Sequence, residues 1–465
     1  MSDYDRGKFY PKRQIYTTKH TPATFTRGFT TVKGEGSFSK FGKESGSKDS
    51  SGDTPKKQPT ILIKPREPAP EDVAASPKKV QKDEPSSSTA APTTKEIEPP
   101  APILKEMTKS MKLIDEGVIC TESLQDYMHE NNDFLVVGIV GAHGVGKSTL
   151  ANLLSQKQIT EEIKRCLFKT PKKEAEEDEF GDSVKILTEH FKGANVRSGE
   201  PKWKEVFKTQ TVDDIENALN ATQGIDFFIT SNRVMFLDCQ PFMSISVLDD
   251  LIQSESKRTN LVSEFIPLEN SGEIQGLQLV TFLMSVCHVL VLVQDWFFDS
   301  NIVRFIHTAE MLKPTISNAE DELIEHFPHL LLVHNKALME DFTPNKFRVM
   351  QQTYKMLFQK TKLNLKSNMG LGSGRIINYL NKDNCGSAIN LFLIPQVDLD
   401  SKLTFTGHPP VEDLVRRLRA IIMGSTKNPL THVQLSEKTW LVYCSKVWDT
   451  VKKSPFFVEY TKLMP

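Results

Sequence analysis

The sequence predicts an α/β fold in which a mostly parallel sheet is covered by helices on both faces. Five short apolar runs recur between residues 134 and 394, and segments with helical spacing of apolar residues lie between them. Short buried strands that alternate with helices form parallel sheets joined by right-handed crossovers. The first run leads directly into Gly141-Ala-His-Gly-Val-Gly-Lys-Ser148, a phosphate-loop pattern. We therefore expect a P-loop domain of the G type.

The first part of the chain, residues 1 to about 105, is expected to be a disordered low-complexity tail. Eleven of the 26 prolines lie between Pro55 and Pro102, among Ser, Thr, Lys and Glu. Such a composition cannot bury enough apolar area to offset the entropy of ordering. The first 60 residues hold 12 Lys/Arg against 6 Asp/Glu, interleaved with aromatic residues. This basic arm is either a solvated tail, a set of docking segments or a surface on which single-stranded RNA could stack.

The five apolar runs are the predicted strands, because buried parallel strands have this composition. They are residues 134–140, 234–237, 289–293, 330–333 and 391–394. Helices are expected at 149–165, 274–285, 300–313, 345–361 and 411–423. Together these elements define a G-like domain over residues 106–425. A C-terminal helical segment, 426–465, is expected to pack on that domain through an apolar stripe of Trp440, Cys444, Val447, Trp448 and Val451.

Three connections are longer than a minimal domain of this kind needs, namely residues 166–221, 242–272 and 364–387. The first contains an acidic run over 174–179, and the third contains Gly370-Leu-Gly-Ser-Gly374. Loops longer than about 15 residues are usually functional or disordered. We expect all three inserts to be mobile and to offer interaction surfaces.

Composition and charge exclude several other classes of protein. The net charge is -1, from 58 Lys/Arg and 59 Asp/Glu, so no direct sequence-specific binding of nucleic acid is expected. No apolar run approaches the roughly 18 residues that a membrane span requires, and the N-terminus has no hydrophobic signal core. The six cysteines are scattered, as reduced and mostly buried thiols are. We expect a cytoplasmic protein that contacts no membrane.

The glycine-rich segment is the predicted phosphate-binding loop. Glycines let the backbone approach phosphate oxygens, and the helix that begins near Lys147 directs its positive end at the anion. Lys147 should reach the β- and γ-phosphates. The ring of His143 could donate to a phosphate, but its backbone N–H, or no special role, is the simpler expectation. The predicted phosphate-binding residues are Gly141, His143, Gly144, Val145, Gly146, Lys147, Ser148 and Thr149.

A Mg²⁺ ion is expected beside the phosphates, bound by Ser148, Asp238 and Thr222. The hydroxyl of Ser148 is the P-loop metal ligand, and Asp238 ends the second apolar run, where such domains carry the acidic residue that holds Mg²⁺ through water. Thr222 is the first candidate for the threonine of the first switch, and Thr230 is the second.

The hydrolytic part of the site departs from the GTPase pattern D-x-x-G followed by a water-positioning glutamine. This chain reads Asp238-Cys-Gln-Pro241-Phe242. Proline has no N–H to offer the γ-phosphate, and phenylalanine cannot orient water. Gln240 stands two positions early and is a weak catalytic candidate, so no catalytic residue is assigned.

Base recognition also departs from its usual pattern, N-K-x-D. Here Asn335-Lys336-Ala is followed by Leu338. Leucine removes the charged acceptor that would pair with the two donors of guanine. The expected cofactor is therefore a purine nucleotide, ATP or GTP/GDP, with Asn335 and Lys336 packing on the base and bracing the phosphate loop.

The segments 136–154, 222–226 and 237–241 resemble the SMG nine family of nonsense-mediated mRNA decay subunits, and the resemblance covers most of 110–465. The Asp-Cys-Gln-Pro departure is typical of that family. The resemblance implies a G-fold protein that forms a heterodimer, through its G domain, with the SMG eight subunit. It also implies that the pair binds and restrains the SMG one kinase, which phosphorylates the helicase UPF one. An indirect association with mRNA surveillance complexes follows.

The residues alone are compatible with two functions. The first is a non-catalytic nucleotide-binding regulatory subunit, because the binding half of the site is intact and the hydrolytic half is eroded. The second is an active dynamin-like or guanylate-binding-type GTPase, in which Thr222 and an unidentified residue complete the site. A P-loop kinase has little support, since no lid-like arginine cluster is present.

Overall fold

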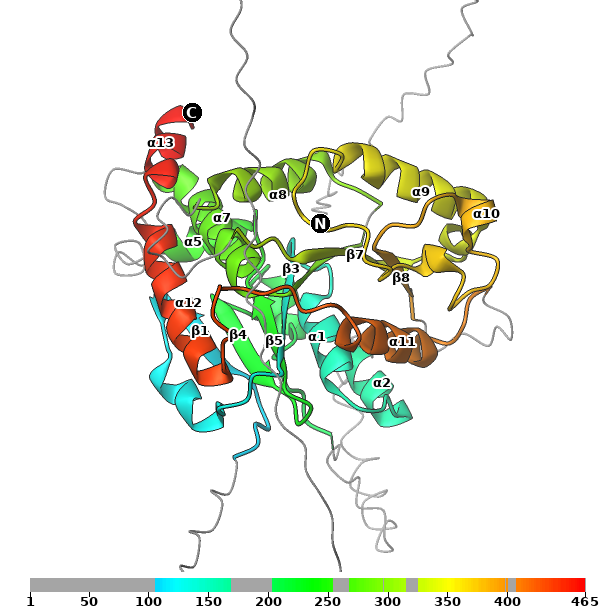
Figure 1. Ribbon diagram of the computed structural model, residues 1–465, viewed down its shortest axis with the longest axis horizontal. Helices are drawn as coiled ribbons and strands as arrows, with labels where there is room; N and C mark the ends of the chain where they lie inside the picture. Colours follow the sequence, from blue (N-terminus) through cyan, green and yellow to red (C-terminus); the bar gives the residue numbers. More distant parts are fainter. Residues whose placement is uncertain are drawn as a thin grey trace, which may run out of the picture. The chain divides into compact units, whose positions relative to one another are not determined.

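The computed structural model describes residues 105–168, 203–253, 267–295, 297–314, 325–397, 399 and 407–464 (Figure 1). The expected N-terminal tail, with its basic aromatic arm, lies outside the described residues. The acidic run over 174–179 also lies outside them, together with the central parts of the first two inserts.

An eight-stranded sheet, in the order β2-β1-β4-β5-β3-β6-β7-β8, forms the centre of the described part. The strands are β1 (Met111–Asp115), β2 (Val118–Ile119), β3 (Leu135–Gly141), β4 (Ile225–Ile229), β5 (Val234–Cys239), β6 (Val289–Gln294), β7 (His329–Ala337) and β8 (Leu391–Pro395). Strands β5, β3, β6, β7 and β8 are parallel to one another. Strand β4 is antiparallel to β5, and β1 is antiparallel to both β4 and β2. The predicted α/β fold with a mostly parallel sheet is confirmed.

The five predicted runs are the five parallel strands, whereas β1, β2 and β4 were not predicted. Strand β4 (Ile-Asp-Phe-Phe-Ile) is buried along its whole length although it contains Asp226. Lys112 of β1 forms an ion pair with Asp226 at 2.8 Å, so the partner that allows this carboxylate in a strand comes from a distant part of the chain. Only the tertiary contact explains the strand.

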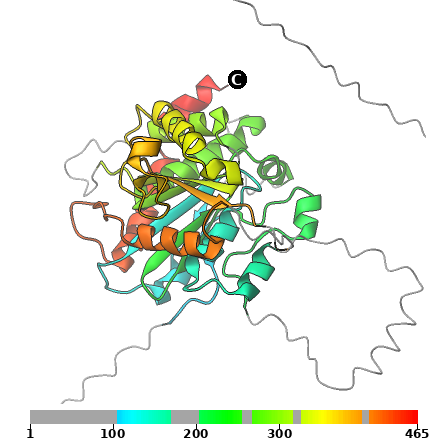
Figure 2. The same cartoon turned by 90° about the vertical axis from the view of Figure 1, so that its right-hand side faces the viewer.

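The helices cover both faces of the sheet, and the handedness of the crossovers sets the face of each. From β3 the chain moves to one side of the sheet through α1 (Lys147–Ser155), which packs beside α11 (Val411–Met423). From β5 it crosses back to β6, β7 and β8 through α7 (Leu268–Val286), α8 (Ser300–Leu312) and α9 (Pro344–Leu357), which cover the opposite face (Figures 1 and 2).

Smaller elements fill the connections. They are α2 (Glu161–Phe168), α4 (Val212–Glu216), α5 (Ile245–Gln253), α10 (Lys382–Cys385), α12 (Glu437–Lys452), α13 (Pro455–Leu463) and the 3-10 turns η1 (Glu122–Tyr127), η2 (Met339–Phe342) and η3 (Leu371–Ser373).

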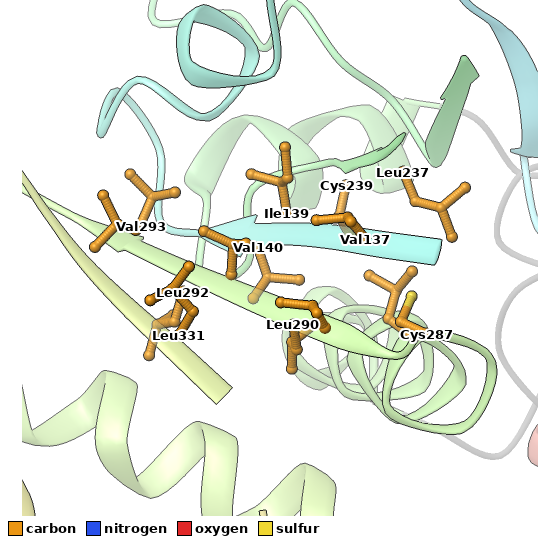
Figure 3. Packing of buried hydrophobic residues seen from close by; sticks show 14 of the residues in the cluster. Val137, Ile139, Val140, Leu237, Cys239, Cys287, Leu290, Leu292, Val293 and Leu331 are labelled. Carbon is orange, nitrogen blue, oxygen red and sulfur yellow. The ribbon is translucent and has the colours of Figure 1, made fainter. Parts of the chain in front are cut away.

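The core lies on both sides of β3, which is buried from end to end. Figure 3 shows aliphatic side chains of β3, β5, β6 and β7 packed against one another, among them Val137, Ile139 and Leu292. Full burial of one such side chain stabilises the fold by about 1.5–3 kcal/mol. Gly138 lies directly under the end of α7, where an added Cβ would approach the sulfur of Cys287 to 3.0 Å. The close approach of α7 to β3 therefore depends on this glycine.

One predicted helix, 149–165, is divided in the structure into α1 and α2. Arg419 donates to the carbonyl oxygens of Leu154 and Lys157, which satisfies the acceptors at the end of α1. The hydroxyl of Thr160 then accepts from the backbone N–H of Ile163 and starts a new helix.

The third insert, 364–387, is packed on the sheet rather than forming a loose surface. Met369, Leu371, Leu380 and Cys385 are buried, and an added Cβ at Gly370 would stand 1.9 Å from the carbonyl oxygen of Ile389. These buried anchors hold the insert against the sheet, which its length alone does not reveal, and an interaction surface on its exposed residues stays a prediction.

The C-terminal stripe is core, as predicted: all five of its side chains are buried on α12. Its two indoles also bond to distant backbone, Trp440 to the carbonyl oxygen of Val286 and Trp448 to that of Gly117, each at 3.0 Å. The six cysteines are free, and four of them are buried. No helix within the described ranges is long and apolar enough to cross a membrane.

Candidate functional site

The loop between Gly141 and Lys147 joins the end of β3 to the start of α1. Strand β3 lies between β5 and β6. The next parallel strand along the chain, β5, pairs with one edge of β3, and the one after it, β6, pairs with the other edge. In open α/β sheets, ligands bind outside the carboxyl ends of strands at such a switch point. The topology therefore places the predicted phosphate loop where a ligand site is expected.

Two glycines of the loop are required by close approaches. An added Cβ at Gly141 would stand 2.4 Å from the carbonyl oxygen of Val293, and one at Gly146 would stand 2.5 Å from the side-chain nitrogen of Asn335. Gly146 also has a φ of 89°, in the left-handed region. Asn335 Nδ2 donates to the carbonyl oxygen of Val145 at 2.8 Å. Packing on this side of the loop thus depends on the absence of a side chain.

Lys336, the second predicted base-site residue, also contacts the phosphate loop. Its Nζ lies 3.2 Å from the carbonyl oxygen of Gly144 and 3.1 Å from a carboxylate oxygen of Asp295. Asp295, which directly follows β6, was not predicted from the sequence. Its only sequence signal is its position after an apolar run, at the same sheet edge as the loop.

Lys147 is buried and folds back over its own loop. Its Nζ donates to the carbonyl oxygen of Ala142 at 2.8 Å. Burial lowers the pKa of Lys147, and the nearby carboxylate of Asp238 offsets part of that effect. An anion beside this ammonium would replace the water that burial removes.

The three predicted metal ligands converge. The Ser148 hydroxyl donates to Asp238 Oδ2 at 2.6 Å, the Thr222 hydroxyl donates to the same oxygen at 3.1 Å, and the two hydroxyls lie 3.2 Å apart. Asp238 is fully buried, and burial raises its pKa to about 6, although Lys147 and Ser148 act against that rise. The second oxygen, Oδ1, is buried without a partner among the described residues.

These oxygens fit Mg²⁺, which usually binds one or two carboxylates together with waters and phosphate oxygens. Ser148, Thr222 and Asp238 would hold the ion, and the free Oδ1 could accept from one of its waters. The described ranges contain no cluster of three or more His, Cys, Asp or Glu that could bind a metal without a phosphate. Thr230, the second threonine candidate, lies at the opposite end of β4 and bonds to Val234 instead.

The residues that replace the hydrolytic motif serve the core. Phe242 is buried and stacks on Phe305 with ring centroids 4.6 Å apart. Gln240 Oε1 accepts from the backbone N–H of Gly224 at 2.8 Å, and the backbone N–H of Gln240 donates to the carbonyl oxygen of Gly224. The side chain of Gln240 therefore joins β5 to the start of β4. Pro241 lines a cleft beside the predicted phosphate loop.

Leu338, which stands where a guanine-binding aspartate is expected, is 58% exposed. The nearest aspartate in the sequence, Asp341, accepts from the backbone N–H of Leu338 at 2.8 Å. Asp341 Oδ2 also lies 3.5 Å from His334 Nε2. This carboxylate therefore already has partners in the protein.

The opposite wall of the cleft includes, beside the predicted Thr222, two residues that no motif predicts. Gln210, Asn220 and Thr222 line the cleft together with the phosphate loop, and the space between them is about 60 Å³. His143 is half-buried and contacts both amides, with its Nδ1 2.6 Å from Asn220 Oδ1 and its Nε2 3.0 Å from Gln210 Nε2. The ring is therefore bonded within the protein instead of lying free in solvent, and whether it has a role in binding stays a prediction. Amide side chains in an insert carry no signal that reveals such contacts.

Comparison with known proteins bears on the identity of the chain. Residues 129–337 match the protein-family model Smg8_Smg9. Nonsense-mediated mRNA decay factor SMG9 of Xenopus laevis is 34% identical over 386 residues, which cover 77% of this chain and 68% of that protein. The factor of the same name from Salmo salar is 32% identical over 385 residues, covering 77% and 68%. The chain belongs to the SMG9 family of nonsense-mediated mRNA decay factors.

A more distant relative, Protein SMG9 of Drosophila melanogaster, is 26% identical over 359 residues, covering 76% of this chain and 60% of that protein. The family resemblance inferred from the sequence is confirmed. The segment that matches the Smg8_Smg9 model includes the whole phosphate loop, the oxygen cluster at Asp238 and the two residues that contact the loop, Asn335 and Lys336. Leu338 lies just beyond it.

Proposed function

We propose that the chain is a nucleotide-binding, non-catalytic regulatory subunit in nonsense-mediated mRNA decay. The observation that carries the proposal is the convergence of Ser148, Thr222 and Asp238 beside Lys147, at the switch point of the sheet. Oxygen ligands for Mg²⁺ and a buried ammonium at one loop are what a nucleoside phosphate requires. The same set supports a P-loop domain of the G type.

We expect no nucleotide hydrolysis, because the residues that stand in place of the GTPase motif are buried. Gln240 is bonded to Gly224, and Phe242 is stacked on Phe305, so neither side chain is free to orient a water at the γ-phosphate. An active GTPase would need another water-positioning residue. A turnover assay of the purified protein separates the two functions: several turnovers per minute, abolished by Lys147→Ala, would refute the regulatory one.

The bound nucleotide can be identified directly. The purified full chain is denatured, and the released nucleotide is separated by chromatography against ATP, ADP, GTP and GDP standards. The proposal requires a purine nucleotide in amounts close to the protein, and a Lys147→Ala protein prepared in parallel should release little. A wild-type preparation that releases none, and that gains no stability from any of the four, would contradict nucleotide binding.

An exposed apolar surface lies beside the cleft and supports a protein partner. It consists of Ile215, Leu219, Met243, Ile245 and Ile252, each at least 44% exposed. Its two segments are joined, since Ser244 Oγ donates to Asn220 Oδ1 and Gln223 Nε2 donates to Asp250 Oδ2. Contiguous apolar exposure marks interaction sites, and these hydrogen bonds bring together the two segments that carry the exposed side chains. We assign this cleft-side surface to the SMG eight subunit.

The pairing can be tested by co-expression with the SMG eight subunit. Met243→Asp with Ile245→Asp should abolish co-purification, because each change places a charge in the proposed interface. Met311→Asp with Met356→Asp, at positions that are also exposed but belong to α8 and α9, should leave it intact. Equal co-purification of both variants would place the interface elsewhere.

Kinase regulation follows from the pairing. The heterodimer should bind the SMG one kinase in the cytoplasm and lower its phosphorylation of UPF one, and the unpaired Met243→Asp/Ile245→Asp protein should not. A kinase assay with purified components measures this. An undiminished rate in the presence of excess heterodimer would refute the restraint.

A further inference from the structure

The ring of His143 joins the phosphate loop to the opposite wall of the cleft. An amide oxygen can only accept and an amide nitrogen can only donate. The contacts with Asn220 Oδ1 and Gln210 Nε2 therefore place the proton of the ring on Nδ1 and leave Nε2 as the acceptor. Gln210 Nε2 also lies 2.8 Å from the carbonyl oxygen of Leu219, so the segment 210–220 is closed at its base.

Asn220 is the point at which three segments meet. Its Oδ1 accepts from His143 in the phosphate loop and from Ser244, at 3.2 Å, in the segment that follows β5. Asn220 itself belongs to the segment that leads into β4. Leu219, its neighbour in the chain, and Met243 and Ile245, which flank Ser244, all belong to the cleft-side surface. A change at Asn220 is thus transmitted directly to that surface.

One donor that lines the cleft, and one acceptor on the carboxylate bonded to the lining residues Ser148 and Thr222, have no partner among the described residues. Asn220 Nδ2 is a buried donor without a partner, and Asp238 Oδ1 is a buried acceptor without a partner. Buried polar atoms normally have partners, so such exceptions indicate a missing group. A phosphate oxygen accompanied by hydrated Mg²⁺ supplies an acceptor for the first and a donor for the second.

The position of Asn220 indicates which phosphate of the nucleotide it would contact. Asn335 and Lys336 contact the loop at Val145 and Gly144, where the base is expected. His143, by contrast, directly follows Ala142, whose carbonyl oxygen holds the Nζ of Lys147. Because Lys147 is the residue that reaches the β- and γ-phosphates, Asn220 stands at the end of the site occupied by the terminal phosphate.

We propose that Asn220 is a phosphate-reading residue. Its Nδ2 donates to an oxygen of the terminal phosphate, while its Oδ1 holds His143 and Ser244. Occupancy of the terminal phosphate position therefore fixes the segment 209–222 and the cleft-side surface in one arrangement. This inference rests on the proposed nucleotide binding and adds to it the discrimination between triphosphate and diphosphate.

The experiment compares binding of ATP, ADP, GTP and GDP, each with Mg²⁺, to the full-length wild type, Asn220→Ala and Asn220→Asp. Asn220→Asp keeps an acceptor for His143 and Ser244 but replaces the donor by a charge that repels phosphate. Both variants should lose affinity for the triphosphate by about tenfold or more, the effect of one hydrogen bond to a charged group. Affinity for the matching diphosphate should change by less than about threefold.

A second measurement distinguishes a loss of phosphate recognition from a general loss of structure. Hydrogen exchange in 209–222 should slow on addition of the triphosphate in the wild type and not in either variant. Asn217→Ala, an exposed residue of the same segment, is the matched control and should behave as wild type.

Each outcome has one meaning. Equal losses for triphosphate and diphosphate, or no loss for either, in folded Asn220 variants would overturn the inference and leave nucleotide binding intact. A folded wild type that binds none of the four nucleotides would overturn the proposed function, and this inference with it.

Discussion

Asp238 illustrates how a proposed binding residue can work against the stability of the domain that carries it. Its carboxyl is fully buried, and burial raises its pKa to about 6. A pKa that is higher in the folded than in the unfolded state means that the folded protein binds the proton more tightly. Stability therefore falls as the pH rises from about 4 to about 6, and the loss is complete above that window.

Asp238→Asn should consequently stabilise the nucleotide-free protein. Asparagine keeps an acceptor for Ser148 and Thr222 without the buried charge, and a shift of about two pKa units corresponds to up to about 3 kcal/mol near pH 7.5. About half of this gain should remain at pH 5, where wild-type Asp238 is mostly protonated. Urea unfolding at the two pH values measures it, with the exposed Asp213→Asn as control. A less stable variant at pH 7.5 would show that the carboxylate is structurally required.

Leu338 should influence whether the site prefers GTP or ATP. Because the side chain is 58% exposed, an aspartate is tolerated there, and it restores the charged acceptor for guanine. Leu338→Asp should raise the ratio of GTP affinity to ATP affinity by about tenfold. Met339→Asp, which adds the same charge at an equally exposed neighbour, should leave the ratio unchanged. Competition binding of the two nucleotides decides the matter, and an unchanged ratio in Leu338→Asp would remove Leu338 from the base site.

Residues with a fixed spacing could be predicted from the sequence, and residues placed by tertiary contacts could not. The phosphate loop, Asp238 and Thr222 follow from patterns at strand ends, and the structure brings them together. Asn220 and Gln210 are ordinary amides in an insert. Their role depends on His143, 77 and 67 positions away, and no local pattern encodes that distance.

At the scale of elements, an ion pair between Arg233 and the buried Glu437 adds to the apolar stripe and the two indole hydrogen bonds that hold α12 in place. Arg233, in the turn between β4 and β5, donates through Nε to Glu437 at 2.7 Å, at the first position of α12. Burial alone would raise the pKa of Glu437, but hydrogen bonds from Arg233 and Asn131 outweigh it and lower the pKa. Breaking one partner of a buried pair leaves the other charge uncompensated.

We therefore expect Arg233→Ala and Glu437→Gln each to lower the free energy of unfolding by about 3 kcal/mol. The double variant should lose much less than the sum, because the second change removes the charge that the first one stranded. Urea unfolding of the four proteins gives the coupling energy. Additive losses would mean that the two side chains stabilise α12 independently. Arg416→Ala, whose partner Asp413 is on the surface, should cost little.

Local sequence patterns predict some strands of the sheet and not others. Uninterrupted apolar runs marked the five parallel strands, since a strand buried on both faces has no polar side to alternate with. Strand β4 broke the pattern with Asp226, and β1 is only five residues long and contains two adjacent buried residues instead of an alternation. Both belong to the antiparallel side of the sheet, where pairing with a distant strand replaces the local apolar signal.

At the scale of the whole molecule, the nucleotide should act as part of the fold. The cleft is narrow, about 60 Å³ against the 300–1,000 Å³ usual for small-molecule sites. Lys147 must leave the carbonyl oxygen of Ala142, and the cleft must widen, before a triphosphate fits. Binding energy is thus coupled to the arrangement of the inserts.

Lys147→Met tests this coupling without emptying the core. The methionine fills the space of the buried stem but carries no ammonium whose pKa burial lowers, so the nucleotide-free variant should be as stable as wild type or more so. Wild type should gain about 2.7 kcal/mol from a nucleotide at a hundred times its Kd, a rise of several degrees in Tm, and the variant should gain nothing. Lys157→Met, an exposed lysine after α1, should keep the full rise. Equal rises in wild type and Lys147→Met would mean that the nucleotide stabilises the protein from another site.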